Sequence, residues 1–220
     1  MQLEVRWHRQ DGMRLPVAVW CPGPGCRMIS SGVAGGGIGP REWVLNAQVP
    51  ASYSRMDPAA HVAELAAGLG LAGEGVGLLT AASVASAVLC GDEGVHAAAT
   101  VGLRVPAWAA APPGVADGER ATPWRPGTIN IIVSVPVPLR DAAYVNAVMT
   151  ATEAKTQAVL EAGFRATGTA SDAICVAAPV AGDPEDFAGP RSLWGARIAR
   201  AVHAAVRAGA LRYQAEVGPA

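Results

Sequence analysis

The stretch TINIIVSV, residues 128–135, carries the clearest strand pattern in the chain, because β-branched side chains fill most of it. A helical segment follows from Leu139 to Glu161, and Gly163 stands just past its expected end. The apolar run AICVAAP, residues 173–179, has the length and composition of a second strand. This alternation predicts an α/β (or α+β) domain, with one mixed sheet and helices packed on it in layers.

The chain on the amino-terminal side continues this pattern with apolar runs of strand length. They are LPVAVW (15–20), CRMISSGV (26–33), WVLNAQVP (43–50), GVGLLTAA (75–82) and the pair ASAVLC (85–90) and VHAAATVGL (95–103) around a GDEG turn. Asp57 and Pro58 predict the start of a helix that ends at Leu69. A last helix is expected from Pro190 to Gly209. We treat residues 1–220 as a single domain.

Two segments are expected to be loops. Residues 35–40 are glycine-rich, and residues 105–127 contain five prolines, three glycines and two tryptophans, Trp108 and Trp124. A loop as long as the second one is usually functional or disordered. Its tryptophans either close over a ligand or anchor the loop to the core.

Composition excludes several classes of function. The 220 residues are 51% hydrophobic and 16% charged, with a net charge of −1, so nothing in the totals attracts nucleic acid or anionic lipid. The first residues lack the apolar core of a secretory signal, and no stretch predicts a membrane span. The four cysteines form no CxxC pair, which indicates free thiols and a cytoplasmic protein. The sequence leaves a homo-oligomer open.

Common catalytic and metal motifs are absent from the sequence. It has no HExxH, no GxSxG and no His/Cys cluster, so we expect neither a metal site nor a resident cofactor. The glycines at 35–39 lack the GK[ST] ending of a phosphate-binding loop, and those at 70–77 lack dinucleotide-binding spacing. Tight turns explain both groups of glycines.

The helix from Leu139 to Glu161 carries the first candidate site residues. At 3.6 residues per turn, Val145, Val148, Met149, Thr152, Thr156 and Val159 share one face, and Lys155 lies at its border. Glu153 falls on a polar face. This face is either simply solvated or it directs Glu153 or Lys155 into a cleft, as a general base and an oxyanion stabiliser respectively.

Two further segments could take part in chemistry. Thr169, Ser171 and Asp172 bring hydroxyls and a carboxylate together before the 173–179 strand, where they either bind substrate or make an ordinary turn. His96 lies in a strand of small residues. Its ordinary pKa near 6.5 suits proton transfer, although a lone histidine in a strand is more often a structural residue than a catalyst.

Several motifs in a consistent order resemble the adenosylcobinamide amidohydrolase family. They are SSGVAGGG (30–37), NAQVP (46–50), GLLTAASV (77–84), HAAATVGL (96–103), PGTINIIV (126–133), VNAVMTATEAKTQAVLEAG (145–163), TGTASDAICVAAP (167–179) and AGPRSLWGARIARAVHAAV (188–206). The most specific are PGTINIIV and the combination of TATEAKT with TGTxSD. Together these matches cover nearly the whole chain.

The resemblance implies hydrolysis of the amide between aminopropanol and the corrin propionate of adenosylcobinamide. The products would be adenosylcobyric acid and 1-amino-2-propanol, in corrinoid salvage, and some relatives also act on complete cobamides. Cobalt would enter only as part of the corrinoid substrate. A corrin is a broad apolar plate fringed with amides, so we expect a wide cleft with a hydrogen-bonding rim.

The matched motifs also imply the site residues. We expect Glu153, His96, Lys155 and Asp172 to be catalytic, and Asn46, Asn130, Thr169 and Ser171 to bind substrate. Glu153 or His96 would act as acid and base, Lys155 would stabilise the oxyanion and Asp172 would orient its neighbours. Thr169 or Ser171 as a covalent nucleophile is the internal alternative. A non-catalytic corrinoid- or nucleotide-binding module is the alternative function.

Overall fold

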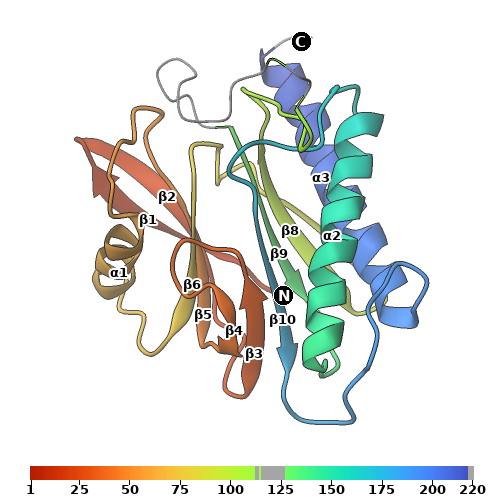
Figure 1. Cartoon of the computed structure of the whole chain (residues 1–220). Helices are drawn as coiled ribbons and strands as arrows, with labels where there is room; N and C mark the ends of the chain where they lie inside the picture. The colour runs from red at the N-terminus through yellow and green to blue at the C-terminus, as the bar shows by residue number, and fades with distance from the viewer. Residues whose placement is uncertain (112–113, 115–126, 218–220) are drawn as a thin grey trace.

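The computed structural model of the protein describes residues 1–111, 114 and 127–217 (Figure 1). Its described part contains two β-sheets and three helices. The strands are β1 (Glu4–Gln10), β2 (Met13–Trp20), β3 (Cys26–Ser30), β4 (Gly37–Pro40), β5 (Trp43–Gln48), β6 (Gly75–Thr80), β7 (Val88–Asp92), β8 (Val95–Gly102), β9 (Thr128–Ser134) and β10 (Ala173–Pro179). The helices are α1 (Pro58–Gly68), α2 (Asp141–Glu161) and α3 (Leu193–Val217).

These elements are stacked in four layers (Figure 1). Helix α1 covers the outer face of a four-stranded sheet of order β1-β2-β5-β6. The inner face of that sheet packs on a six-stranded sheet of order β4-β3-β10-β9-β8-β7. Helices α2 and α3 cover the far face of the six-stranded sheet. The prediction of a layered α/β domain is confirmed, and the structure adds that the strands divide between two mixed sheets.

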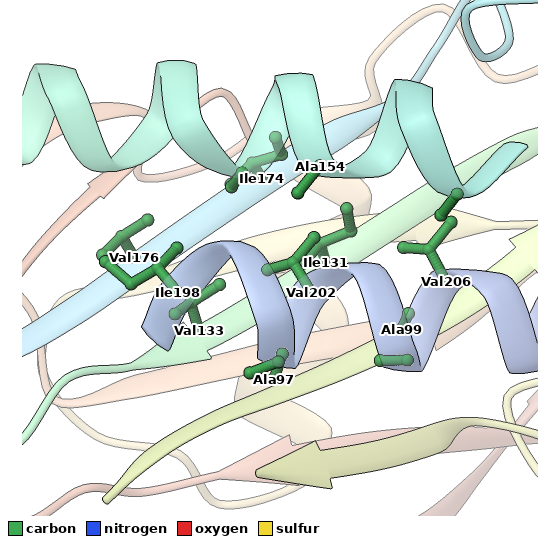
Figure 2. Close-up of a cluster of buried hydrophobic side chains, with 14 of the residues drawn as sticks. Ala97, Ala99, Ile131, Val133, Ala154, Ile174, Val176, Ile198, Val202 and Val206 are labelled. Carbon is green, nitrogen blue, oxygen red and sulfur yellow. The ribbon is translucent and has the colours of Figure 1, made fainter. Parts of the chain in front are cut away.

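The strand–helix–strand unit read from residues 128–179 forms the centre of the six-stranded sheet. β9 and β10 are parallel neighbours, and α2 connects them across the sheet. Figure 2 shows branched side chains of these strands, such as Ile131 and Val176, directed at Ile198 and Val202 of α3. Small residues allow close packing: a Cβ on Gly209 would lie 2.6 Å from Cγ2 of Val101 on β8.

A second parallel unit, β5-α1-β6, belongs to the four-stranded sheet. Two close approaches stabilise it. A Cβ on Gly77 would lie 2.2 Å from Cγ1 of Val62, so the glycine allows α1 to rest on β6. Ala34 pairs with the same Gly77 from the other side, which attaches the segment after β3 to the edge strand β6. This segment connects the two sheets.

Three local predictions are wrong. The glycine-rich segment 35–40 is not only a loop, because Gly37–Pro40 form β4, which pairs with β3. The last helix does not begin at Pro190: Ser192 Oγ accepts the Gly195 amide hydrogen, and the helix starts after it at Leu193. It also continues past Gly209 to Val217, although its last buried residue is Ala210.

The face of α2 that carries Val145, Met149 and Val159 is only partly buried. Val145 and Met149 are exposed, whereas Val159 is fully buried. Most of the buried residues of α2 are alanines, and Lys155 is among the others. Small side chains at these positions allow α2 to pack closely on the sheet and on α3.

Most of the long segment 105–127 lies outside the described residues, and Trp124 is among them. Of its described part, Ala107 pairs with Gly168, and Trp108 is partly exposed. Assignment of residues 1–220 to one domain stays a prediction.

Candidate functional site

A cavity of about 600 Å³ opens where the carboxyl ends of β5 and β6 meet the amino ends of β9 and β10. Its size is typical of a site for a small ligand. Most of its wall is apolar, and several of its polar residues lie at the starts of β9 and β10. The lining residues that matter below are Tyr53, Arg55, Met56, Thr128, Asn130, Ser171 and Asp172.

Asp172 is the centre of the polar end of the cavity. Its Oδ1 accepts hydrogen bonds from the Ile129 amide at 2.9 Å and from Thr169 Oγ1 at 2.5 Å. Its Oδ2 accepts from the Thr169 amide at 3.1 Å and from Lys155 Nζ at 2.5 Å. Four donors occupy the acceptor sites of this carboxylate. Asp172 therefore orders the start of β9 and the 169–172 turn, and its charge is neutralised by Lys155.

Gly168 makes room for this ion pair. A Cβ at this position would lie 2.1 Å from Asp172 Oδ2 and 2.5 Å from Lys155 Nζ. A side chain at residue 168 would therefore push the two charged groups apart. The glycine of the TGTxSD motif is explained by this close approach of backbone to ion pair.

Two hydroxyls meet at the cavity wall beside Asp172. Thr128 Oγ1 and Ser171 Oγ lie 2.7 Å apart, and Ser171 Oγ donates to the Gly127 carbonyl oxygen at 3.1 Å. Because the Ser171 hydroxyl hydrogen is used in the bond to the Gly127 carbonyl oxygen, the Thr128 hydroxyl donates to Ser171 Oγ. Thr128 is buried, whereas Ser171 is exposed to the cavity side.

A chain of buried amides runs between the sheets beneath the cavity. Asn130 Nδ2 donates to Asn46 Oδ1 at 2.8 Å and to the Leu79 carbonyl oxygen at 3.0 Å, and Asn46 Nδ2 donates to Thr100 Oγ1 at 3.0 Å. These bonds link β9, β5, β6 and β8. Among the described residues, no donor bonds to Asn130 Oδ1. This oxygen is itself buried, although the Asn130 residue contributes to the cavity lining.

The opposite wall comes from the segment between β5 and α1. Arg55 makes bidentate contacts with both Asp57 and Glu64, so its charge is offset by two carboxylates, whose pKa values it lowers. Next to it, Tyr53 is buried, and its hydroxyl lies 3.1 Å from His61 Nδ1. Burial is the main cause that raises the pKa of Tyr53 and lowers that of His61.

The structure brings six of the eight predicted site residues together. Asn130, Ser171 and Asp172 line the cavity, while Lys155, Thr169 and Asn46 bond to these residues from behind. The contacts follow from the parallel pairing of β9 with β10, which sets Asn130 beside Ala173.

Glu153 and His96 lie elsewhere. Glu153 is exposed on α2, two residues from the buried Lys155, and lines a separate hollow of about 280 Å³ with Arg200 and His203 of α3. His96 lies four residues along β8 from Thr100, which is about 13 Å at ~3.3 Å per residue. Neither side chain lines the cavity at Asp172. Their catalytic roles stay predictions.

The wall residues Tyr53, Arg55 and Met56 were missed by sequence reasoning. They follow NAQVP in a segment that carries no periodic pattern. The available signal was the tyrosine and histidine eight residues apart around a helix start, but their contact depends on how the segment turns.

The residues that the structure describes show neither a metal-binding cluster nor a membrane-spanning helix. Within them, no group of three or more histidine, cysteine, aspartate or glutamate side chains is arranged to hold a metal ion. No helix of this part is long and apolar enough to cross a membrane.

Comparison with known proteins identifies relatives across nearly the full length. Residues 3–218 match the family model described as adenosylcobinamide amidohydrolase. A protein of Methanosarcina mazei named adenosylcobinamide amidohydrolase is 31% identical over 190 residues, covering 82% of this chain and 88% of the relative. A protein of Halobacterium salinarum with the same name is 33% identical over 191 residues, covering 84% and 80% respectively.

Proposed function

The chain belongs to the adenosylcobinamide amidohydrolase family, and from this premise we propose that it hydrolyses the aminopropanol amide of adenosylcobinamide. The products are adenosylcobyric acid and 1-amino-2-propanol, which returns an incomplete corrinoid to cobamide synthesis. Complete cobamides carry the same amide and are included as a second substrate. The observation that carries the proposal is the match over residues 3–218, whose motifs converge on one cavity.

The shape of the cavity supports an amide arm as its occupant. A volume of about 600 Å³ with an apolar wall and a polar end suits a side chain of the corrin better than the whole plate. The plate then rests at the mouth, beside exposed apolar side chains such as Met56 and Val33. The polar end presents hydroxyls and an amide to the scissile group.

Both charged side chains of the wall are already paired. Arg55 is held by two carboxylates, and Asp172 by Lys155 and three further donors. A wall without free charge suits the neutral amide and hydroxyl of an aminopropanol arm, because an unpaired ion would lose hydration there without a partner.

The reaction requires three events at the scissile amide. An oxygen nucleophile adds to the carbonyl carbon, the carbonyl oxygen becomes an oxyanion, and the C–N bond breaks as the nitrogen gains a proton. We assign Asn130, Thr128 and Ser171 to binding and orientation of the amide. Asp172 holds the 169–172 turn in place, and Lys155 neutralises it, so these two act as positioning residues.

Water is the nucleophile in this proposal, and Ser171 or Thr169 is the alternative. Ser171 faces the cavity but donates its hydrogen to a carbonyl, whereas Thr169 donates to the Asp172 carboxylate, which could act as a base. Replacement of each hydroxyl separately distinguishes them. Near-complete loss of kcat in Ser171→Ala or Thr169→Val would identify that hydroxyl as the nucleophile, whereas a modest loss in both variants leaves water as the nucleophile.

The test is mass-spectrometric product analysis of the purified protein with adenosylcobinamide, and in a second arm with a complete cobamide. Each arm is run with and without a chelator. Release of adenosylcobyric acid and aminopropanol supports the proposal, and a chelator effect would reveal a metal requirement. If the folded protein binds the corrinoid but leaves it intact, the proposed hydrolase activity is wrong. The protein would then be a non-catalytic corrinoid-binding module.

A further inference from the structure

Tyr53 and His61 form a stacked and hydrogen-bonded pair where the cavity meets α1. Their ring centroids lie 5.5 Å apart with an interplanar angle of 20°, and Tyr53 Oη lies 3.1 Å from His61 Nδ1. Tyr53 is 7% exposed and His61 is 4% exposed. Tyr53 lines the cavity, while His61 lies behind it on α1. Such a pair holds a phenol in one orientation.

The pair leaves the phenol with unused hydrogen-bonding capacity. A phenol has one hydrogen to donate and can accept bonds as well. When His61 carries its hydrogen on Nδ1, it donates to Tyr53 Oη and the phenol hydrogen is free for another acceptor. A neutral imidazole in this tautomer therefore orders the tyrosine without consuming its donor.

The surroundings favour a neutral imidazole and a protonated phenol. Burial and the Arg55 charge lower the pKa of His61, against Glu64 and Asp57, which raise it, and His8 lowers it further. His61 is therefore neutral at pH 7. Burial raises the pKa of Tyr53, against Arg55, so the phenol keeps its hydrogen.

His8 completes the environment from β1. Its Nε2 hydrogen donates to the Gln48 carbonyl oxygen at 2.8 Å, because a carbonyl can only accept. Its ring meets His61 edge to face, with centroids 6.4 Å apart. His8 therefore contributes a neighbouring ring to the surroundings of His61.

We propose that Tyr53 is a catalytic residue whose hydroxyl donates a hydrogen bond to the amide carbonyl oxygen of the substrate as that oxygen becomes an oxyanion, and that His61 is its positioning residue. This inference rests on the proposed amidohydrolase function. Such a donor works through the charge that develops in the transition state, so it raises the rate of the chemical step more than substrate binding.

The test compares Tyr53→Phe with Tyr144→Phe in steady-state hydrolysis of adenosylcobinamide. Tyr144 is an equally buried tyrosine whose hydroxyl donates to the Arg27 carbonyl oxygen at 2.7 Å, far from the cavity. We expect Tyr53→Phe to lower kcat by roughly 10²–10³-fold with KM within about twofold, as for loss of one oxyanion donor. Tyr144→Phe should keep kcat within about twofold.

Two variants of His61 test the positioning role. His61→Asn places an amide N–H near the position of Nδ1 and should retain most of the wild-type kcat. His61→Leu removes the donor and should lower kcat by at least about tenfold. Thermal unfolding of each variant shows whether a loss of activity reflects loss of fold.

The outcomes separate this inference from the proposed function. If wild-type protein releases no adenosylcobyric acid, the function fails and the inference fails with it. If wild type is active and Tyr53→Phe keeps its kcat, only the inference is overturned. A raised KM with unchanged kcat in Tyr53→Phe also overturns it, since the tyrosine then contributes only to substrate binding.

Discussion

Lys155 Nζ and Asp172 Oδ2 lie 2.5 Å apart and join the middle of α2 to the turn before β10, with both side chains about nine-tenths buried. The pair connects the two most specific motifs of the sequence, TATEAKT and TGTxSD. Because Asp172 also holds the Ile129 amide at the start of β9, one carboxylate sets the geometry of the polar end of the cavity.

Breaking this pair should cost stability as well as activity. Lys155→Met leaves a buried carboxylate without its counter-charge, which costs about 3–5 kcal/mol in comparable pairs. Urea unfolding measures the change. Asp186→Asn, which breaks the exposed pair with Arg140, is the control and should change the unfolding free energy by less than ~1 kcal/mol. Equal losses in both variants would contradict the special role of the buried pair.

Gly168→Ala should disturb the same pair without removing a charge. The new Cβ would lie 2.1 Å from Asp172 Oδ2, and relief of this overlap should cost roughly 1–3 kcal/mol. We expect a lower midpoint of urea unfolding and a lower kcat. Gly68→Ala, at the last residue of α1, is the control: its Cβ meets nothing within 4 Å, so the unfolding free energy should not fall. An unchanged midpoint in Gly168→Ala would show that the pair can move freely.

Asn46→Ala should destabilise the protein through the groups that it leaves unpaired. Asn130 loses an acceptor and Thr100 loses a donor, both between the sheets. Unsatisfied buried groups cost about 1–3 kcal/mol each, so we expect a loss of at least ~2 kcal/mol in chemical unfolding. Asn130→Ala should in addition raise KM for the corrinoid. An unchanged free energy of unfolding in Asn46→Ala would mean that water takes over the hydrogen bonds of the Asn46 side chain.

For Glu153 and His96, the sequence motifs and the geometry of the cavity predict different effects of mutation. Neither lines the cavity at Asp172, so Glu153→Gln and His96→Asn should each keep kcat within about threefold of wild type, whereas loss of an essential acid or base costs about 10²–10⁴-fold. Steady-state kinetics on folded variants decides the question. A hundredfold loss in either variant would reinstate that residue as the acid or base expected from the motifs.

A fall in pH should lower the free energy of unfolding because His61 has a lower pKa in the folded protein than in the unfolded chain. Burial holds its pKa in the folded protein below the ordinary value of about 6.5, so the unfolded chain takes up a proton first as pH falls. The stability contributed by neutral His61 is therefore present above about pH 6.5 and is lost as pH falls from there through the folded pKa. Unfolding curves at pH 7.5 and 5.5 should show a larger drop for wild type than for His61→Asn. An equal loss of stability in wild type and His61→Asn would show that a group other than His61 causes the pH dependence.

Local sequence was sufficient for most of the secondary structure. Residues 128–135, 139–161 and 173–179 correspond to β9, α2 and β10 with small shifts at their ends, because β-branched runs and helical spacing act over a few residues. The helical spacing did not reveal which face of α2 is buried. Most of its buried residues are alanines, whereas Val145 and Met149 are exposed.

The motifs of the sequence also determined the family and most of the polar residues at the cavity. Lys155 and Asp172 are only 17 residues apart, so a strand–helix–strand unit nearly dictates that they meet. Tertiary structure alone decided the rest. The second sheet, the contact of Asn130 with Asn46 across 84 residues, the separation of Glu153 from Asp172 and the Tyr53–His61 wall depend on how distant segments pack. Local patterns encode which residues prefer burial, whereas the choice of partner comes from the free energy of the assembled layers.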